Sequence, residues 1–298
     1  MESPAVAFDS NADLSGAVAR LFIYPVKSCA GIEVQEALLT DAGLEFDRAW
    51  MLVDAQGAFL TQRALPRMAL IRPRIARDQG ALLLQAPGLG ELRVPLATDA
   101  TQPLTPVVVW KDTVPAWDMG DEAAHWLTAF LGQPCRLVRF DPAQRRLSST
   151  DWTSGRAVPN QFSDGFPLLL TSTASLQELN TRLQAAGQPV VGMERFRPNV
   201  VIDGVQAHDE DRLELLRIDA GAAEVQLQPV KPCARCPIPN IDPATAESRP
   251  AVGDMLRSYR QDRRLGGAVT FGMNAIVCQG AGQVLRVGQA VAADLCFD

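Results

Sequence analysis

The chain has 298 residues, of which 47% are hydrophobic and 21% charged, so it can bury a large core without disulfides and has the composition of neither a disordered chain nor a membrane protein. Its net charge of −6 argues against a partner bound through nucleic-acid phosphates. The N-terminal residues lack a basic start followed by an apolar core, and the six cysteines are scattered apart from one pair. We therefore expect a cytoplasmic protein with reduced cysteines and with no membrane or nucleic-acid partner.

The first part of the chain is predicted to be mostly β. Short apolar runs of strand character alternate there with turn residues. The expected strands include residues 21–26, 32–40, 49–53 and 82–85, and the expected hairpin turns are 54–57 and 78–80.

Helices are predicted further along the chain. Residues 121–131 place apolar side chains on one face and stop at Gly132, and residues 171–187 show a similar stripe with Ser175 and Glu178 at capping-box spacing. The remaining expected elements are a short helix at 252–260 and strands at 200–202, 223–230 and within 268–291. With residues 141–160 as a linker, the pattern predicts an α+β fold that is predominantly β and barrel-like.

One loop combines two cysteines with three prolines. Residues 232–242 read Pro-Cys-Ala-Arg-Cys-Pro-Ile-Pro-Asn-Ile-Asp, in which the prolines stiffen the backbone and Arg235 favours the thiolate form of a nearby sulfur. A zinc site would need a second close Cys or His pair, and a thioredoxin-type redox pair would need a βαβ context, and the sequence shows neither. The prolines and the flanking cations argue against two inert buried thiols, which leaves a single-thiolate ligand at Cys236 or a sulfur carrier.

Polar side chains at the ends of predicted strands form a second group. The loop Tyr-Pro-Val-Lys-Ser at 24–28 offers the Lys27 ammonium and the Ser28 hydroxyl, which can hold an oxyanion together with backbone N–H groups. Arg48 and Arg63 add guanidinium groups at the ends of neighbouring strands, where both can converge on one phosphate. Taken singly, each of these residues also fits a solvated surface position.

Two polar motifs lie in the second half of the chain. Asp164 precedes an apolar strand, where it is either a turn former or a functional carboxylate. Arg197 and Asn199 belong to the segment Arg-Phe-Arg-Pro-Asn and offer donors to an anion or to the edge of a heterocycle.

Taken together, these motifs resemble a known family. The ordered set Tyr-Pro-Val-Lys-Ser, Asp-Arg-Ala-Trp, Thr-Gln-Arg, Phe-Ser-Asp, Phe-Arg-Pro-Asn and Cys-Ala-Arg-Cys with Ile-Asp-Pro is similar to that of MOSC-domain molybdenum-cofactor proteins related to the mitochondrial amidoxime reducing component and its bacterial homologues. The similarity runs over residues 18–291. It implies a β-rich MOSC N-terminal domain at 15–140 packed on a MOSC β-barrel at 141–298, with molybdopterin bound between them.

The resemblance also assigns roles to residues. It implies that Cys236 ligates molybdenum and that Cys236 and Asp164 take part in catalysis. A thiolate is a soft ligand that suits a redox metal of this kind. The positions that correspond to the family's contacts with the molybdenum-molybdopterin cofactor are Lys27, Ser28, Arg48, Arg63, Arg197, Asn199 and Cys236.

The implied activity is that of a molybdenum-containing oxidoreductase that reduces N-hydroxylated compounds, namely hydroxylamines, amidoximes and N-oxides, to amines. Because the chain ends at Asp298 without room for a ferredoxin domain, electrons are expected from a separate protein of the ferredoxin, flavoprotein or cytochrome type. The alternative is a MOSC sulfur carrier or molybdenum-cofactor carrier without reductase turnover. Gly165 and Phe166 stand where relatives have hydroxyl residues, so the substrate preference is expected to differ.

Overall fold

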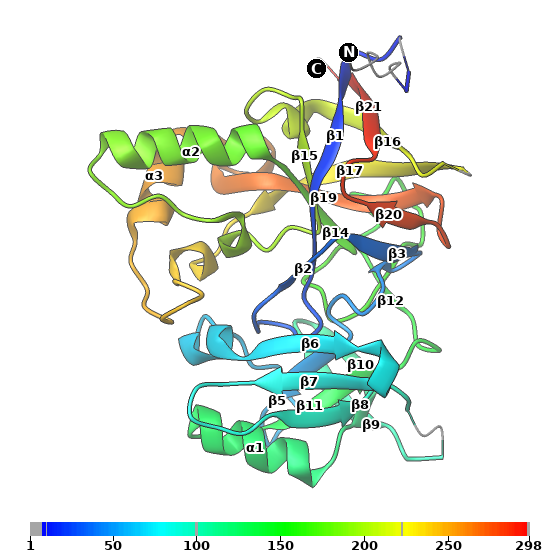
Figure 1. Cartoon of the computed structure of the whole chain (residues 1–298), viewed down its shortest axis with the longest axis vertical. Helices are drawn as coiled ribbons and strands as arrows, with labels where there is room; N and C mark the ends of the chain where they lie inside the picture. The colour runs from blue at the N-terminus through cyan, green and yellow to red at the C-terminus, as the bar shows by residue number, and fades with distance from the viewer. Residues whose placement is uncertain (1–7, 10, 99–100, 222, 297–298) are drawn as a thin grey trace.

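The computed structural model describes residues 8–296 except residues 10, 99–100 and 222. The chain folds into two β-rich halves stacked along its long axis, and helices α2 (Thr173–Ala185) and α3 (Ala251–Tyr259) lie beside the half that contains both ends of the described chain (Figure 1). The predicted α+β class, predominantly β, is confirmed, because strands greatly outnumber the α-helices among the described residues.

Seven strands close into a barrel in one of the halves. They run in the order β14-β15-β1-β21-β16-β17-β19, and β14 pairs with β19 to complete the circle. Closure leaves no edge strand within this ring. The strands are β1 (Leu14–Ile23), β14 (Leu168–Ser172), β15 (Val200–Asp203), β16 (Leu213–Asp219), β17 (Glu224–Ala234), β19 (Ala268–Gln279) and β21 (Ala290–Leu295).

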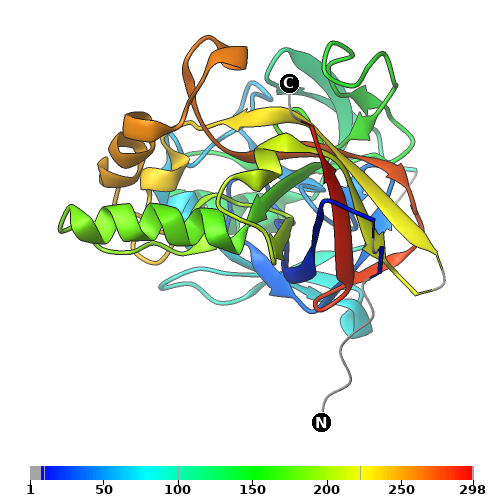
Figure 2. The same cartoon turned by 90° about the horizontal axis from the view of Figure 1, so that it is seen from above.

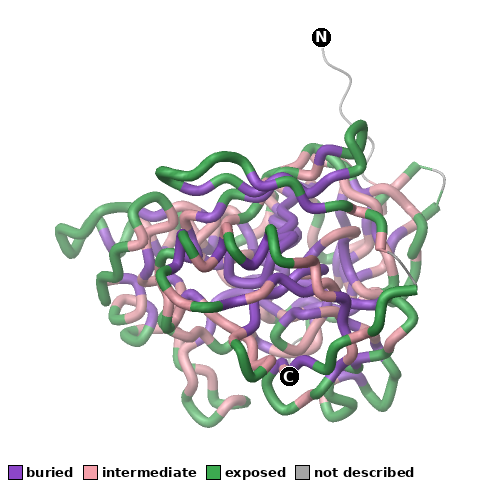
Figure 3. Tube along the Cα trace, turned by 90° about the horizontal axis from the view of Figure 1, so that it is seen from below, coloured by how far each residue is buried: buried purple, intermediate pink, exposed green. Residues whose placement is uncertain are grey.

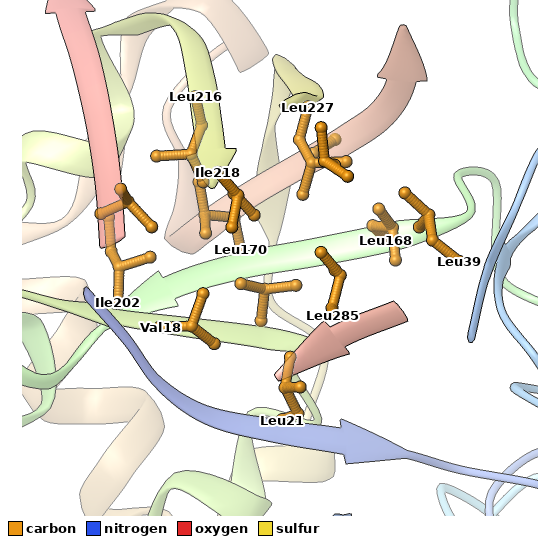
Figure 4. Packing of buried hydrophobic residues seen from close by; sticks show 14 of the residues in the cluster. Val18, Leu21, Leu39, Leu168, Leu170, Ile202, Leu216, Ile218, Leu227 and Leu285 are labelled. Carbon is orange, nitrogen blue, oxygen red and sulfur yellow. The ribbon is translucent and has the colours of Figure 1, made fainter. Parts of the chain in front are cut away.

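The barrel encloses an apolar interior. Val18, Leu21, Leu170, Ile202 and Leu216 are at most 1% exposed and belong to one buried cluster (Figure 4). Successive residues of a strand face opposite sides, so apolar residues at a period of two fill the inside of the ring. Each fully buried aliphatic side chain contributes about 1.5–3 kcal/mol, which makes the barrel a stable frame for the loops at its ends.

Helices α2 and α3 cover one side of the barrel. Figure 2 shows both on the same side of the ring. Leu179 and Leu183 of α2 and Leu256 of α3 share a buried cluster with Phe22 of β1 and Phe271 of β19. The apolar stripes of these helices are therefore core packing.

The predicted capping box of α2 is wrong. Ser172 caps the helix, because its hydroxyl oxygen accepts a hydrogen bond from the Ser175 N–H at 3.1 Å. Ser175 lies inside the first turn and donates to the buried carboxylate of Glu210 at 2.8 Å. Thr171 and Ser172 complete strand β14, and hydroxyl residues fit a strand end and a cap equally well, so the sequence pattern could not separate the two.

The other half combines two sheets with α1 (Asp121–Leu131). The helix ends at Gly132 as predicted, and this glycine has the positive φ, 76°, that favours glycine after a helix. The four-stranded sheet has the order β5 (Trp50–Val53), β11 (Arg136–Phe140), β10 (Asp112–Asp118), β9 (Thr105–Val109). The three-stranded sheet has the order β6 (Arg72–Ala76), β7 (Ala81–Gln85), β8 (Leu92–Pro95).

Several short strands lie outside the barrel ring and outside the two sheets of the other half. The strand expected at 32–40 is interrupted at Gln35, because β2 (Ile32–Val34) pairs with β1 whereas β3 (Glu36–Thr40) pairs with β20 (Val284–Arg286). Residues 14–44 thus lie with the barrel half, and the assignment of domains to 15–140 and 141–298 stays a prediction. The other short strands are β4 (Gly43–Leu44), β12 (Arg146–Leu147), β13 (Pro159–Asn160) and β18 (Gln261–Asp262).

The buried segments gather in the interior of the molecule and the exposed segments lie at its periphery (Figure 3). Within the described part of the chain, no helix has both the length and the apolar character needed to cross a bilayer. Binding and catalytic residues of proteins concentrate on loops held by a rigid scaffold, so we look for the site on the loops that pass between the two halves.

Candidate functional site

The loop between β1 and β2 carries Lys27 and Ser28 to the junction of the two halves. The Lys27 N–H donates to the Trp50 carbonyl at 2.8 Å, and the Trp50 N–H donates to the Pro25 carbonyl at 2.9 Å. The side-chain amide of Gln62 donates to the Ser28 carbonyl at 2.9 Å. Because the other half of the molecule fixes three backbone groups of this loop, the ammonium and the hydroxyl start from a rigid support.

One pocket of about 140 Å³ brings the predicted residues together. Its lining comes from both halves of the molecule, from loops and from the barrel strands β14, β17 and β19. All the predicted site residues line it, namely Lys27, Ser28, Arg48, Arg63, Asp164, Arg197, Asn199 and Cys236. Their proximity is an observation, whereas the roles assigned to them stay predictions.

Three donors surround Asp164 at the mouth of the pocket. Its carboxylate is 61% exposed and accepts hydrogen bonds from Lys27 Nζ at 2.5 Å, Trp110 Nε1 at 3.2 Å and Arg63 Nη2 at 3.4 Å. Burial acts to raise the pKa of Asp164, but Lys27 and then Arg63 and Trp110 outweigh it and hold this pKa below its usual range. Burial also lowers the pKa of Lys27, which the Asp164 charge opposes. At neutral pH Asp164 is therefore an ionised acceptor.

Arg48 and Arg197 both stack on the buried ring of Tyr24. Their guanidinium carbons lie 4.4 Å and 4.2 Å from the ring centroid. Arg48 Nη1 pairs with Asp47 Oδ2 at 2.6 Å, whereas Arg197 Nη1 donates to the Cys29 carbonyl at 2.5 Å and forms no ion pair with a described carboxylate. Burial, followed by repulsion from Arg48, lowers the pKa of Arg197 to about 10. The pocket therefore contains a cation whose charge is not neutralised by a neighbouring carboxylate.

Asn199 supports the arginine pair from below the pocket surface. It is 1% exposed, and its Oδ1 accepts from Arg48 Nη1 and from the Leu169 N–H, both at 3.1 Å. Its Nδ2 donates to the Phe22 carbonyl at 3.2 Å. Since protein groups already engage both ends of the amide, Asn199 positions Arg48, and its predicted contact with a cofactor stays a prediction.

The segment with the two cysteines forms another wall, with Cys233 inside β17 and Cys236 in the loop after the strand ends at Ala234. Cys233 and Cys236 are half-buried, and they form no disulfide with each other. Arg235 donates to Cys233 Sγ at 3.0 Å and to the Phe196 carbonyl at 3.0 Å. No group of three or more His, Cys, Asp or Glu side chains in the described part of the chain can hold a metal ion. What this wall presents to the pocket is a pair of separate thiols beside a guanidinium group.

The backbone is strained around the pocket. Ser28, Arg48 and Arg197 have φ values of 65°, 49° and 58°, and Trp110 at the rim has 56°. Residues other than glycine rarely adopt this left-handed conformation, which costs about 1–3 kcal/mol each and persists only where surrounding contacts enforce it. Such strain concentrates at functional sites, so the backbone points to the same place as the side chains.

Two known domain families match the sequence in chain order. The MOSC N-terminal beta barrel domain matches residues 15–134, and the MOSC domain matches residues 158–292. The chain belongs to the MOSC-domain family. Both MOSC segments contribute residues to the pocket. A crystal structure of the YUAD protein from Bacillus subtilis covers 94% of this chain and 96% of that chain at 11% identity, but its TM-score of 0.43 is too low to bear on the site.

Similarity to other MOSC proteins extends over most of the chain. Mitochondrial amidoxime-reducing component 1 of Mus musculus is 37% identical over 253 residues, which is 82% of this chain and 72% of the relative. The Homo sapiens protein of that name is 35% identical over 288 residues, or 93% of this chain and 82% of the relative. Molybdenum cofactor sulfurase of Homo sapiens is 30% identical over 272 residues, or 86% of this chain but 29% of the relative.

Two residues that contact the pocket lining escaped prediction from the sequence. Trp110 occupies the tip of a hairpin, where no motif singles it out. Arg146 lies in the segment expected as a linker, yet its side chain is 4% exposed and donates to the carbonyls of Ser163 at 2.6 Å and Asp164 at 3.2 Å. A hairpin tip and a linker carry no periodicity or spacing that could have indicated these contacts.

Proposed function

We propose that this protein is a molybdenum-cofactor-dependent oxidoreductase of N-hydroxylated compounds, which reduces hydroxylamines and N-oxides to amines and amidoximes to amidines. One observation carries the proposal: five basic side chains and the thiol of Cys236 open onto a single pocket. Fixed positive charge suits a phosphate group, and a thiolate suits a soft redox metal. The relatives named amidoxime-reducing components support the reaction class.

The donors of the pocket fit a cofactor of the molybdopterin type. Arg63 and Arg235 each keep a buried Nε–H without a hydrogen-bond partner, and Arg197 has no carboxylate partner among the described residues. A buried donor that stays unpaired costs about 1–3 kcal/mol, so such donors indicate a ligand with acceptor atoms. A phosphate and a pterin ring present acceptors of this kind.

Each side chain has a distinct task in this proposal. Cys236 would ligate molybdenum, and Lys27, Ser28 and Arg48 would hold the phosphate. When bound, the cofactor would supply the two-electron removal of an oxygen atom, while the protein binds and orients it. The remaining cofactor contacts would come from Arg63, Arg197 and, through Arg48, Asn199.

Asp164 would act through its charge. An acid transfers a proton efficiently when its pKa lies near the working pH, and the pKa of Asp164 is held below its usual range. We therefore assign Asp164 the task of keeping Lys27 in place at the pocket mouth. The proton that leaves with the substrate oxygen would come from water.

The overall reaction needs partners outside the chain. Reduction of an N–OH group to N–H consumes two electrons and two protons and releases one water molecule. The proposal includes a separate electron-transfer protein of the ferredoxin, flavoprotein or cytochrome type, and a cytoplasmic location.

Metal analysis together with an activity assay tests the proposal. Protein produced with added molybdate should contain about one molybdenum per chain and should reduce an amidoxime with an artificial electron donor. Cys236→Ala should lose the metal and the activity while keeping the unfolding temperature. Cys278→Ala, which removes an exposed thiol on β19 away from the pocket, is the matched control and should retain both. Full metal and activity in Cys236→Ala would overturn the ligand assignment.

The second candidate is a sulfur carrier or a carrier of the cofactor without turnover. Similarity to molybdenum cofactor sulfurase over 86% of this chain favours it. In that case mass spectrometry should detect one extra sulfur on Cys236, or the protein should bind the pterin without reducing any hydroxylamine, amidoxime or N-oxide.

A further inference from the structure

An exposed tryptophan stands beside the pocket mouth. Trp110 and Lys111 form the two-residue connection between β9 and β10, whose flanking residues Val109 and Asp112 are paired. Hairpin tips of this length favour Asn and Gly, because the central residues take positive φ values. Trp110 nevertheless adopts a φ of 56° with its side chain 43% exposed, and it is the only exposed one of the five tryptophans, all of which are described. Neither turn chemistry nor core packing explains an indole at this position.

Contacts with the pocket residues fix the indole. Its Nε1 donates to Asp164 Oδ1 at 3.2 Å, the Arg63 guanidinium carbon lies 4.7 Å from the ring centroid, and the Phe59 ring centroid lies 4.9 Å away. Asp164 and Arg63 both line the pocket. Through these two contacts the indole borders the pocket at its rim, without being one of the residues that line it.

Arg146 locks the hairpin to the Asp164 loop. Its Nε pairs with Asp112 Oδ2 at 2.8 Å, directly after the hairpin tip, while its Nη atoms hold the Ser163 and Asp164 carbonyls. The hairpin tip and the loop thus move as one unit, and the indole keeps its place relative to the pocket. Beside this rim, the space next to the Gly165 Cα is open, because no atom lies within 4 Å of the position that a Cβ would take.

We propose that Trp110 is a specificity-determining residue that packs against a flat aromatic group carried by the N-hydroxylated substrate. A rigid, partly exposed ring next to open space offers a partner for a second ring, whereas a small aliphatic substituent gains little from it. The reacting group itself rests on the function proposed above. Arg146 is the positioning residue of this arrangement, since it acts through the hairpin.

Two substrates that differ only in this substituent test the inference. Benzamidoxime and acetamidoxime share the reacting group and carry a phenyl or a methyl group. Trp110→Ala should lower the benzamidoxime to acetamidoxime ratio of kcat/KM by about five- to tenfold, the effect expected from one aromatic contact, mainly through a higher KM for benzamidoxime. Trp110→Phe keeps a ring but removes the N–H donor to Asp164, so the ratio should stay within about threefold of the wild-type value.

The same experiment includes a matched control, and it distinguishes packing of Trp110 against the substrate from a role of Trp110 in holding Asp164. Leu147→Ala truncates another large apolar residue, which is 45% exposed and lies on β12, and should leave the ratio unchanged. If Trp110 served only to hold Asp164, the Ala and Phe variants would behave alike and both substrates would suffer equally. That result, or an unchanged ratio in Trp110→Ala, would overturn the inference.

Binding can be followed without turnover. Benzamidoxime should quench the tryptophan fluorescence of the wild-type protein saturably, and Trp110→Phe should lack this signal. A wild-type protein that shows the quenching but reduces neither amidoxime would refute the proposed function and leave the inference standing. A wild-type protein that reduces both amidoximes without such quenching would refute the inference alone.

Discussion

Replacing Arg146 by methionine is the sharpest test of how the pocket is held together. The side chain is 4% exposed, and its guanidinium group joins β12 to Asp112 and to residues 160–164. Methionine has a similar length but no donors, so the substitution removes every hydrogen bond and keeps much of the packing. The acceptors that lose their donor are the Asp112 carboxylate, the Asn160 side-chain oxygen and the carbonyls of Gln161, Ser163 and Asp164.

The expected loss in the free energy of unfolding depends on which of these acceptors water can reach in the variant. The Asp112 side chain is 31% exposed and Asp164 is exposed, so both can be hydrated in the variant. Ser163 is 8% exposed, so its carbonyl oxygen stays buried without a donor, whereas the Asn160 side-chain oxygen keeps the Ser163 hydroxyl as a donor at 3.1 Å. A buried acceptor without a donor costs about 1–3 kcal/mol, and the lost ion pair adds to this, which gives about 3 kcal/mol in total. For a chain of this size the unfolding temperature should fall by about 6 °C.

The neighbouring arginine provides the control. Arg145 is exposed and forms no ion pair with a described residue, so Arg145→Met should change the unfolding temperature by less than about 1–2 °C. Thermal unfolding of both variants, followed by circular dichroism, compares the same substitution at adjacent positions. If the unfolding temperature of Arg146→Met lies within about 1 °C of that of Arg145→Met, the hydrogen bonds of Arg146 contribute little to stability and the reasoning fails.

Two further predictions concern pH. Burial, followed by repulsion from Arg260, lowers the pKa of His208 to about 4. Between about pH 6.5 and 4 the unfolded chain therefore binds more protons than the folded chain. The free energy of unfolding should fall by up to about 2 kcal/mol as the pH is lowered through this range. His208→Asn, which tolerates the φ of 68°, should flatten this dependence in urea unfolding, and parallel curves would contradict the account. Because Lys27 keeps the pKa of Asp164 low, Asp164 should stay ionised between about pH 5 and 8. The pH dependence of kcat/KM in this range should therefore have the same shape in the wild-type protein and in Asp164→Asn. A limb that vanishes in this variant would identify Asp164 as the acid.

Elements with strong local signals were predictable. Helix α1 carries an apolar face and a terminal glycine, and its predicted bounds agree with the structure. Weaker signals failed where long-range pairing decides. The run at 32–40 has continuous strand character, yet it divides at Gln35 because its two parts pair with β1 and β20. Pairing partners more than a few residues away leave no trace in local periodicity.

The sequence by itself determined the chemical groups of the site and the protein's family. Lys27, Arg48, Asp164, Arg197 and Cys236 stand in ordered motifs, and residue type together with order suffices for that inference. What these groups do in the folded chain depends on their surroundings, which the motifs do not describe.

Only the tertiary structure decided which charges are paired. Lys27 meets Asp164 across 137 positions, and Arg197 reaches the Cys29 carbonyl across 168 positions instead of meeting a carboxylate. Trp110 and Arg146 joined the site for the same reason, since their contacts come from segments that fold onto one another. Charge pairing, burial and backbone strain are properties of such contacts, and they exist only once segments distant in the sequence have packed together.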